Sequence, residues 1–367
     1  MKFECNTAEF SAACVNVMRA VSKKVTIPTI EGILVECGSG TLSLTGYDFE
    51  FGINKTMPCE VYESGAIIIN AQTLTSILAR LGTENVLIET NGVEVTVVSG
   101  ETIYNITGID ADEYPELPSV TGGYPFSVDQ KVLKEMINQT VFAVADNENA
   151  KPVHTGLKFE LTENQLQLVG VDGYRLAIRK ETIKFDGEDM EFIVPKKAIK
   201  ELVKLMGDEG DILINVGKRH IIFEIENYSI ISRLLDGDFL DYKAVVSKSS
   251  TTTVLINVND AIDSIQKIVP IVENNQKNPI RCKFDNDEMR VSTISSIGKV
   301  RDYIHANISG NGVEIGFNSK YLLDAFGASD VDEVRIELNG PVNPAKILPV
   351  QGDRFLFLVL PMRLKSE

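Results

Sequence analysis

The sequence lacks the residues from which most catalytic and metal sites are built. It contains only three histidines, which lie far apart and show no metal-binding spacing such as HExxH. It has no phosphate-binding motif of the Walker A or GxGxxG type and no GxSxG nucleophile motif. We therefore expect no catalytic residue, no bound metal and no cofactor.

Cysteine and long apolar runs are also scarce. The five cysteines form no CxxC pair, and four of them lie before residue 60, a distribution that fits reduced thiols better than disulfides or zinc. No apolar run approaches the roughly 18–20 residues needed to span a membrane, and the N-terminus has no apolar signal region. The sequence predicts a cytoplasmic protein with no membrane partner.

Helical and strand-like segments alternate along the chain in a repeating order. Six segments have the apolar periodicity of a helix, and strand-like stretches separated by turn residues follow them. The helical segments are residues 9–22, 71–81, 128–141, 196–206, 258–269 and 319–326. Side chains suited to capping a helix N-terminus precede four of them: Asn6 or Thr7, Asn70, Ser127 and Asn257. The chain therefore predicts a strand–helix–strands unit used six times.

The six units combine in pairs. Residues 106–118 and 232–245 are acidic, contain aromatic residues, and each end an even-numbered unit. Stretches rich in Ser, Thr and Gly follow both of them. We therefore predict an α+β fold of three similar domains, 1–122, 123–247 and 248–367, each with two helices packed on antiparallel sheets.

The net charge of −16, from 36 Lys and Arg against 52 Asp and Glu, argues against a nucleic-acid binder unless the cations share one surface. The expected helices do concentrate them: Lys196, Lys200 and Lys204 follow i, i+4 spacing on one helix face. Acidic residues gather in loops such as 110–116 and 208–211. The charge pattern fits a basic wall of helices, and it also fits ordinary solvated helix faces.

Several stretches resemble a known family. Residues 171–177 read VDGYRLA, residues 234–242 read LLDGDFLDY, and residues 360–364 read LPMRL. Two further stretches, TIPTI at 26–30 and TGLKF at 155–159, fall in matching order. Together these segments resemble the bacterial DNA polymerase III beta sliding clamp family from end to end.

This resemblance implies the DNA clamp fold and a head-to-tail ring of two identical subunits around duplex DNA. The expected function is that of a non-catalytic processivity factor, which binds DNA without sequence specificity and slides along it. The implied protein partners are the replicative DNA polymerase, an ATP-dependent clamp loader, and other polymerases and repair proteins that carry clamp-binding peptides. The resemblance implies no cofactor.

In this family, partner peptides bind in a pocket between the second and third domains. By matching stretches, the resemblance assigns to that pocket Val171, Gly173, Tyr174, Arg175, Leu176, Leu240, Val245, Leu358, Val359, Leu360, Pro361, Met362, Arg363 and Leu364. Tyr174 stands where the family often has His, Leu240 where it has Pro, and Ala244 where it has Arg, so the preferred peptide can differ. The tail can also be a final strand packed into the third domain.

The remaining assignments concern DNA and the ring interface. Candidate DNA-binding residues are Lys24, Lys151, Lys196, Lys197, Lys200, Lys204 and Lys277. Ile271 and Val272 match an apolar contact between subunits, or they pack in the core of the third domain. Two other functions remain open: an enzyme using Asp172 or Arg175, and a repeat-built scaffold that does not bind DNA. A turn residue that accepts backbone N–H groups is the stronger interpretation of Asp172.

Overall fold

The computed structural model of the chain describes residues 1–22, 27–120, 122–123, 125–146, 149–185, 187–246, 249–272 and 278–364. Two predicted DNA-binding residues, Lys24 and Lys277, lie outside the described residues. Ser247 and Lys248, at the predicted border between the second and third domains, also lie outside them.

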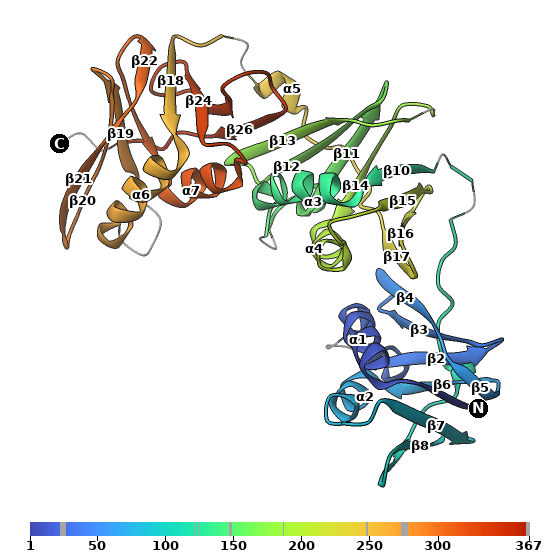
Figure 1. Cartoon of the computed structure of the whole chain (residues 1–367). Coiled ribbons are helices and arrows are strands. Elements are labelled where there is room, and N and C mark those ends of the chain that lie inside the picture. The colour runs from blue at the N-terminus through green and yellow to red at the C-terminus, as the bar shows by residue number, and fades with distance from the viewer. Residues whose placement is uncertain are drawn as a thin grey trace. The chain divides into compact units, whose positions relative to one another are not determined.

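One strand–helix–three-strand unit recurs six times in the described part of the chain (Figure 1). The first two units are β1 (Lys2–Asn6), α1 (Thr7–Val17), β2 (Gly32–Gly38), β3 (Thr41–Tyr47), β4 (Phe51–Pro58), and β6 (Gly65–Asn70), α2 (Ala71–Leu78), β7 (Asn85–Asn91), β8 (Glu94–Ser99), β9 (Thr102–Thr107). The next two are β10 (Phe126–Asp129), α3 (Gln130–Asn138), β11 (Gly156–Thr162), β12 (Gln165–Val171), β13 (Arg175–Thr182), and β14 (Met190–Pro195), α4 (Lys196–Leu205), β15 (Asp211–Val216), β16 (His220–Ile225), β17 (Tyr228–Arg233). The last two are β18 (Thr252–Asn257), α6 (Val258–Ile268), β19 (Ile280–Asp285), β20 (Glu288–Ser295), β21 (Gly298–His305), and β23 (Val313–Phe317), α7 (Ser319–Ala328), β24 (Glu333–Leu338), β25 (Ala345–Pro349), β26 (Phe355–Val359).

Besides short 3-10 helices, three elements add to this repeat in the described residues: the short strands β5 (Glu60–Glu63) and β22 (Asn307–Gly310), and the one-turn helix α5 (Tyr242–Val245). The predicted repeat and its six long helices are thereby confirmed. Helix α5 was not expected, because the sequence around it was interpreted only as an acidic connecting segment.

Side-chain caps explain where three of the helices begin. The side-chain oxygens of Asn6, Asn70 and Asn257 accept hydrogen bonds from backbone N–H groups three residues later, at 3.0, 3.0 and 3.1 Å. The prediction for Ser127 is wrong, because Ser127 lies inside β10 and α3 begins only at Gln130. Strand pairing of β10 with β15 holds that residue in extended backbone.

The strand pairs in the described residues are all antiparallel and form four sheets, which divide between two compact units. The first unit, Met1–Lys131 with Lys197–Leu234, holds the sheets β5-β1-β7-β8-β9 and β10-β15-β16-β17-β4-β3-β2-β6. The second unit, Val132–Lys196 with Leu235–Glu367, holds β14-β11-β12-β13-β26-β25-β24-β18-β22 and β21-β20-β19-β23. Each unit therefore contains one sheet that joins strands of two predicted domains, through β17–β4 and through β13–β26.

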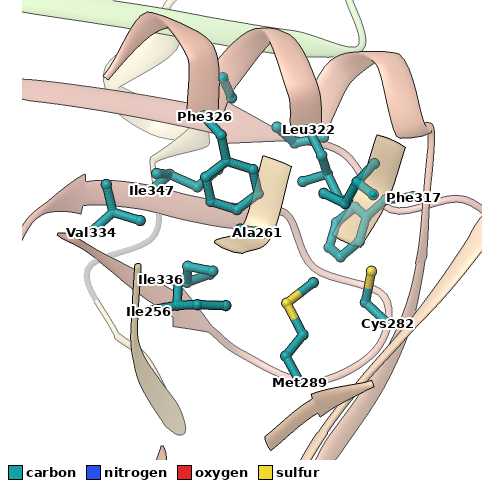
Figure 2. Close-up of a cluster of buried hydrophobic side chains, with 14 of the residues drawn as sticks. Ile256, Ala261, Cys282, Met289, Phe317, Leu322, Phe326, Val334, Ile336 and Ile347 are labelled. Carbon is teal, nitrogen blue, oxygen red and sulfur yellow. The ribbon is translucent and has the colours of Figure 1, made fainter. Parts of the chain in front are cut away.

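Helices α6 and α7 share one apolar core with the two sheets of the second unit (Figure 2). The labelled side chains in Figure 2 come from both helices and both sheets: Ile256, Ala261, Cys282, Met289, Phe317, Leu322, Phe326, Val334, Ile336 and Ile347. These side chains are buried. Since this apolar layer covers one face of each sheet, alternate side chains along the same strands point to the opposite face.

Two strand glycines allow backbone to approach backbone closely. A Cβ atom on Gly170 in β12 would lie 2.4 Å from the carbonyl oxygen of Thr140, and one on Gly46 in β3 would lie 2.6 Å from that of Val17. In both places the end of a helix, or the chain directly after it, crosses the second strand that follows that helix. Glycine is therefore required at these positions by contact, independently of any backbone angle.

Candidate functional site

The VDGYR stretch forms a tight turn between β12 and β13. One carboxylate oxygen of Asp172 accepts hydrogen bonds from the backbone N–H groups of Tyr174 and Arg175, at 2.9 and 3.0 Å. Gly173 takes a positive φ of 90°, a region that favours glycine. The turn interpretation of Asp172 is confirmed, because its oxygens are occupied by donors of the turn itself.

Arg175 is held inside the protein by acidic and aromatic groups. Its Nε lies 2.9 Å from the second oxygen of Asp172, and its Nη1 is bonded to Asp324 on α7. Its guanidinium also lies over the rings of Phe142 and Tyr321, 5.3 and 4.6 Å from their centroids. Arg175 therefore anchors the turn to α7, and its charge is already neutralised within the chain.

Strands β13 and β26 place an apolar surface beside this turn. Leu176 pairs with Leu358 in the register of these strands. These two side chains form one buried cluster with Val169, Val171, Ile178 and Tyr242, and the partly buried side chains Phe239, Val246, Leu356 and Leu360 pack against it. We call these ten residues the apolar surface.

Three apolar side chains next to the apolar surface in sequence are exposed. Tyr174 is 60%, Leu240 38% and Val245 42% exposed. The ring of Tyr174 stacks on Tyr321, with centroids 6.1 Å apart, and its carbonyl oxygen accepts the N–H of Leu360 at 2.9 Å. Exposed apolar groups beside a buried apolar floor are typical of a binding surface.

A buried polar network fixes the segment that carries Leu240 and Val245. The hydroxyl of Tyr242 donates to the carboxylate of Glu160 on β11 at 2.6 Å, and the amide of Gln167 on β12 donates to Glu160 at 2.9 Å. Lys158 binds the same carboxylate at 2.8 Å. Because these bonds join α5 to two strands, they set the position of the exposed rim of the apolar surface.

The network also determines how Glu160 titrates. Burial raises the pKa of this carboxyl. The hydrogen bonds from Lys158 and Tyr242 and the charges of Lys158 and Lys243 lower the pKa by a larger amount, so it lies below its ordinary value. A carboxyl with a depressed folded-state pKa stabilises the protein above its ordinary pKa, and this stabilisation is lost as the pH falls through the folded-state pKa. The network is therefore intact at neutral pH and weakens in acid.

Replacing Tyr242 with Phe tests this network. We expect Tyr242→Phe to lower the free energy of unfolding by about 1–3 kcal/mol, because it removes a buried donor from a carboxylate. Urea unfolding of the full chain measures this loss. Tyr104→Phe is the matched control, since the Tyr104 hydroxyl has no hydrogen bond in the described residues and only the Tyr242 variant should lose stability. Equal midpoints for the two variants would contradict the prediction.

The structure brings together only part of the residue set predicted for the peptide pocket. Val171, Leu176, Leu358 and Leu360 belong to the apolar surface. Val359 instead points into the core of the third predicted domain with Phe357, and Arg175 pairs with Val359 on that opposite face. Neighbouring residues of a strand point to opposite faces, so these two residues support the surface from behind.

The tail beyond β26 is attached at a second point. The N–H of Met362 donates to the carbonyl oxygen of Gly316 on β23 at 2.8 Å. A Cβ on Gly316 would lie 2.8 Å from the side chain of Leu364, so only glycine leaves room for the tail there. Pro361 and Met362 are half-buried, while Arg363 is exposed. The tail therefore packs on the third predicted domain and still presents side chains to solvent.

The predicted DNA-binding lysines of α4 differ in how freely their charges are presented. Lys196 is engaged by the carbonyl oxygen of Val144 at 2.7 Å and by Asp146 at 2.8 Å. Lys197 is bonded to Asp48, and Lys204 lies 2.8 Å from Glu201. Lys200 and Lys151 are exposed and have no ion pair within the described ranges.

A cleft of about 610 Å³ lies between α1 and α4 within the first unit. The cations lining it are Arg19, Lys197 and Lys204, and the carboxylates are Asp48 and Glu201. Glu201 lies 3.3 Å from Arg19 as well as binding Lys204. The cleft thus has mixed charge with one excess cation.

The two predicted interface residues occupy different surroundings. Val272 is half-buried and packs against the core cluster of Figure 2, as the alternative interpretation had it. Ile271 ends the short 3-10 helix Val269–Ile271, and its Cδ1 lies 4.0 Å from where Gly298 would carry a Cβ. Ile271 therefore lies beside the first residue of β21.

Sequence reasoning missed several residues that shape this region. Tyr321 and Asp324 hold Arg175 from α7, and Glu160, Gln167 and Tyr242 fix α5. Tyr242 stood at the end of the LLDGDFLDY stretch and was the available signal.

No helix in the part of the chain described by the structure is long and apolar enough to cross a membrane.

Comparisons with known proteins cover the whole chain. It matches the N-terminal, central and C-terminal domains of the DNA polymerase III beta subunit over residues 1–118, 127–241 and 243–363. A curated protein named beta sliding clamp from Staphylococcus epidermidis is 32% identical to it, and one from Staphylococcus aureus is 31% identical, with 99% of each chain covered in both cases.

Solved structures give the same result. A putative DNA polymerase III beta subunit from Eubacterium rectale has a TM-score of 0.94 at 30% identity, with 99% of both chains covered. The DNA polymerase sliding clamp of Bacillus subtilis has a TM-score of 0.96 at 28% identity over the full length of both chains. The predicted three-domain architecture of helices and antiparallel sheets is confirmed by this agreement.

Proposed function

Because the chain belongs to the DNA polymerase III beta subunit family, we propose that two copies close head to tail into a ring around duplex DNA. The family is that of sliding clamps, non-catalytic processivity subunits of a polymerase holoenzyme. The observation that carries the proposal is the end-to-end match in sequence and fold. The proposed domains are residues 1–122, 123–247 and 248–367, and the proposed place of action is the cytoplasm.

Open sheet edges support the ring. Strand β9 is an edge of the five-stranded sheet, and β21 is an edge of the four-stranded sheet. Ile103 on β9 is 61% exposed, and Ile271 lies beside the start of β21. Edge strands have unpaired N–H and C=O groups that another chain can pair with, and two different edges suit a head-to-tail interface. We propose β9 and β21 as the joining edges, with Ile271 and Val272 behind them.

The proposed duplex contacts are electrostatic and weak. Lys200 and Lys151 have no ion pair with the residues that the structure describes, while Lys196, Lys197 and Lys204 share their ammonium groups with oxygens of the protein. Contacts of this kind bind phosphates without reading sequence and weaken steeply with salt. Weak contacts of this kind let the proposed ring slide along the duplex. The ring stays on the DNA because it encloses the duplex.

The apolar surface is the proposed site for peptides from partners. Its floor is buried, and Tyr174, Leu240 and Val245 are exposed beside it. An apolar peptide segment that covers these side chains would bury surface that water now contacts. The proposed partners are the replicative polymerase, the ATP-dependent clamp loader, and other polymerases and repair proteins. Binding to a ring on DNA raises a partner's effective concentration there.

Retention on circular DNA tests the proposed function. We expect the protein, once loaded by a clamp loader on a closed circle, to stay bound through gel filtration at high salt and to leave when one cut linearises the circle. The control is the same circle, loaded and treated with heat-inactivated nuclease. Retention that survives linearisation would contradict encirclement, and a monomer that never stays on circles would favour the scaffold function.

A further inference from the structure

A basic groove lies on the face of the four-stranded sheet opposite α6. Its volume is about 930 Å³. Helix α6 contacts β20 and β21 on the core side, where Cys282 and Val291 are buried, and the charged residues alternate with these along the strands. The charged lining residues are Arg281, Lys283, Arg290, Lys299, Arg301 and Glu314. Five cations against one carboxylate line this groove in a chain of net charge −16.

Strand register places these cations beside one another. Lys283 pairs with Arg290, so two cationic side chains start from opposite positions on neighbouring strands, whose backbones lie about 5 Å apart. The next strand brings Arg301 opposite Ser292, one row away. Like charges facing each other across strands destabilise a sheet. An external anion that binds the groove would relieve this repulsion.

The protein itself neutralises only part of this charge. Arg281 is paired with Glu314, and Lys283 lies 3.5 Å from Asp285. Within residues 278–364, no carboxylate lies at ion-pair distance from Arg290, Lys299 or Arg301. Three cations of the groove are therefore available to a ligand.

One of these cations is stacked on an exposed aromatic ring. The guanidinium of Arg290 lies 5.2 Å from the ring centroid of Tyr303, which is 46% exposed. The Nε of Arg290 is buried and has no hydrogen-bond acceptor in the described residues. Stacking rather than an ion pair therefore holds Arg290. A guanidinium on an aromatic ring offers flat surfaces on which a nucleobase can stack.

We propose that the basic groove binds single-stranded nucleic acid. Arg290, Lys299 and Arg301 contact its phosphates, and Tyr303 stacks on a base. Guanidinium groups match the geometry of phosphate oxygens, and stacking serves any base, so the binding has little sequence preference. Charge complementarity and the stacked ring select this occupant over an acidic peptide, for which an aromatic ring has no special use. The groove residues are separate from the lysines of α4.

Binding of a fluorescent oligothymidylate of about ten nucleotides tests the proposal with the full-length protein. We expect Lys299→Gln with Arg301→Gln to weaken binding at least tenfold at low salt, and to reduce the slope of log K against log salt by about 1.4, or 0.7 per lost phosphate contact. The matched control, Lys184→Gln with Lys218→Gln, removes two loop cations outside the groove and should change affinity less than twofold. Tyr303→Ala should weaken binding about fivefold or more, whereas Tyr62→Ala, at another exposed tyrosine, should not.

Three results would overturn the proposal. The first is equal affinity of the two double variants, with both melting like the unaltered protein. The second is competition by polyglutamate as effective as that by unlabelled oligonucleotide, which would assign the groove to acidic peptides. The third is loss of retention on closed duplex circles by a groove variant that still forms the dimer in light scattering, which would make the groove part of the duplex contact. Dimer formation is measured because Lys299 and Arg301 lie on β21, the proposed joining edge. A variant that remains dimeric and is retained on circles, but binds single strands more weakly, is the expected combination. The oligonucleotide measurement itself does not require the ring.

Discussion

Deletion of residues 362–367 is expected to leave the chain folded and to weaken binding of partner-derived peptides by at least tenfold. The deletion leaves β26 and its pairing with β13 complete, and Leu358 and Leu360 keep their places in the apolar surface. Within residues 362–364, the part of the deleted segment that the structure describes, it removes one backbone hydrogen bond, from Met362 to Gly316, and two half-buried side chains. Loss of a few central apolar contacts commonly removes most of the binding energy of an interface.

Fluorescence anisotropy with a labelled peptide from the replicative polymerase measures this effect, and a melting curve checks the fold. Val342→Ala is the control, because Val342 is an exposed apolar residue outside the apolar surface. Unchanged peptide affinity in the deletion variant would remove the tail from the proposed peptide site. It would not affect encirclement of DNA, which the circle experiment measures separately.

Gly170→Ala is expected to lower the free energy of unfolding by about 3 kcal/mol or more, at the upper end of the cost of overpacking. The added methyl group would lie 2.4 Å from the carbonyl oxygen of Thr140. This oxygen belongs to the backbone, so it cannot move away by rotation of a side chain. The displaced strand leads directly into Val171 and the turn at Asp172. The variant should therefore also lose peptide binding at temperatures where it is still folded.

Gly38→Ala is the matched control in the same kind of strand. A Cβ at Gly38 meets its nearest neighbour, the hydroxyl of Ser64, at 3.7 Å, which is ordinary contact. We expect this variant to stay within about 0.5 kcal/mol of the parent in chemical denaturation. If Gly170→Ala were as stable as Gly38→Ala, the close approach of Thr140 to β12 would not be a feature of the protein in solution.

The repeat and its helices were predictable because their signals are local. Apolar periodicity over 258–269 and the asparagine cap at 257 specify α6 without reference to the rest of the chain. Ser127 failed as a cap for the opposite reason: its strand pairs with β15, far along the sequence, and that pairing continues past Ser127 to Asp129. Long-range pairing therefore overrode the local preference.

The candidate site was predictable only in outline. The sequence pointed to the turn at Asp172 and to Leu176, but it gave no means of knowing which tail residues share a face with Leu176. The register of β13 against β26 decides that question, and it directs Leu358 to the apolar surface and Val359 away from it. Two adjacent residues of the predicted pocket set thus have opposite environments.

The polar network was hidden from sequence reasoning for a further reason. Glu160 alternates with apolar residues in β11 and so has the pattern of an outward-facing, solvated carboxylate. Its partners Gln167 and Tyr242 come from a different strand and from a distant helix, and only the folded chain brings them together. The same holds for Asp324 against Arg175.

Two sheets continue from one predicted domain into the next. They determine at which junction the proposed ring would open under force. Within a chain, antiparallel ladders pair β17 with β4 and β13 with β26, and the polypeptide also connects the paired domains covalently. A junction between two chains has no such tether. A protein that opens the proposed ring would therefore meet least resistance at the junction between chains, and each chain would leave that junction with its own sheets intact.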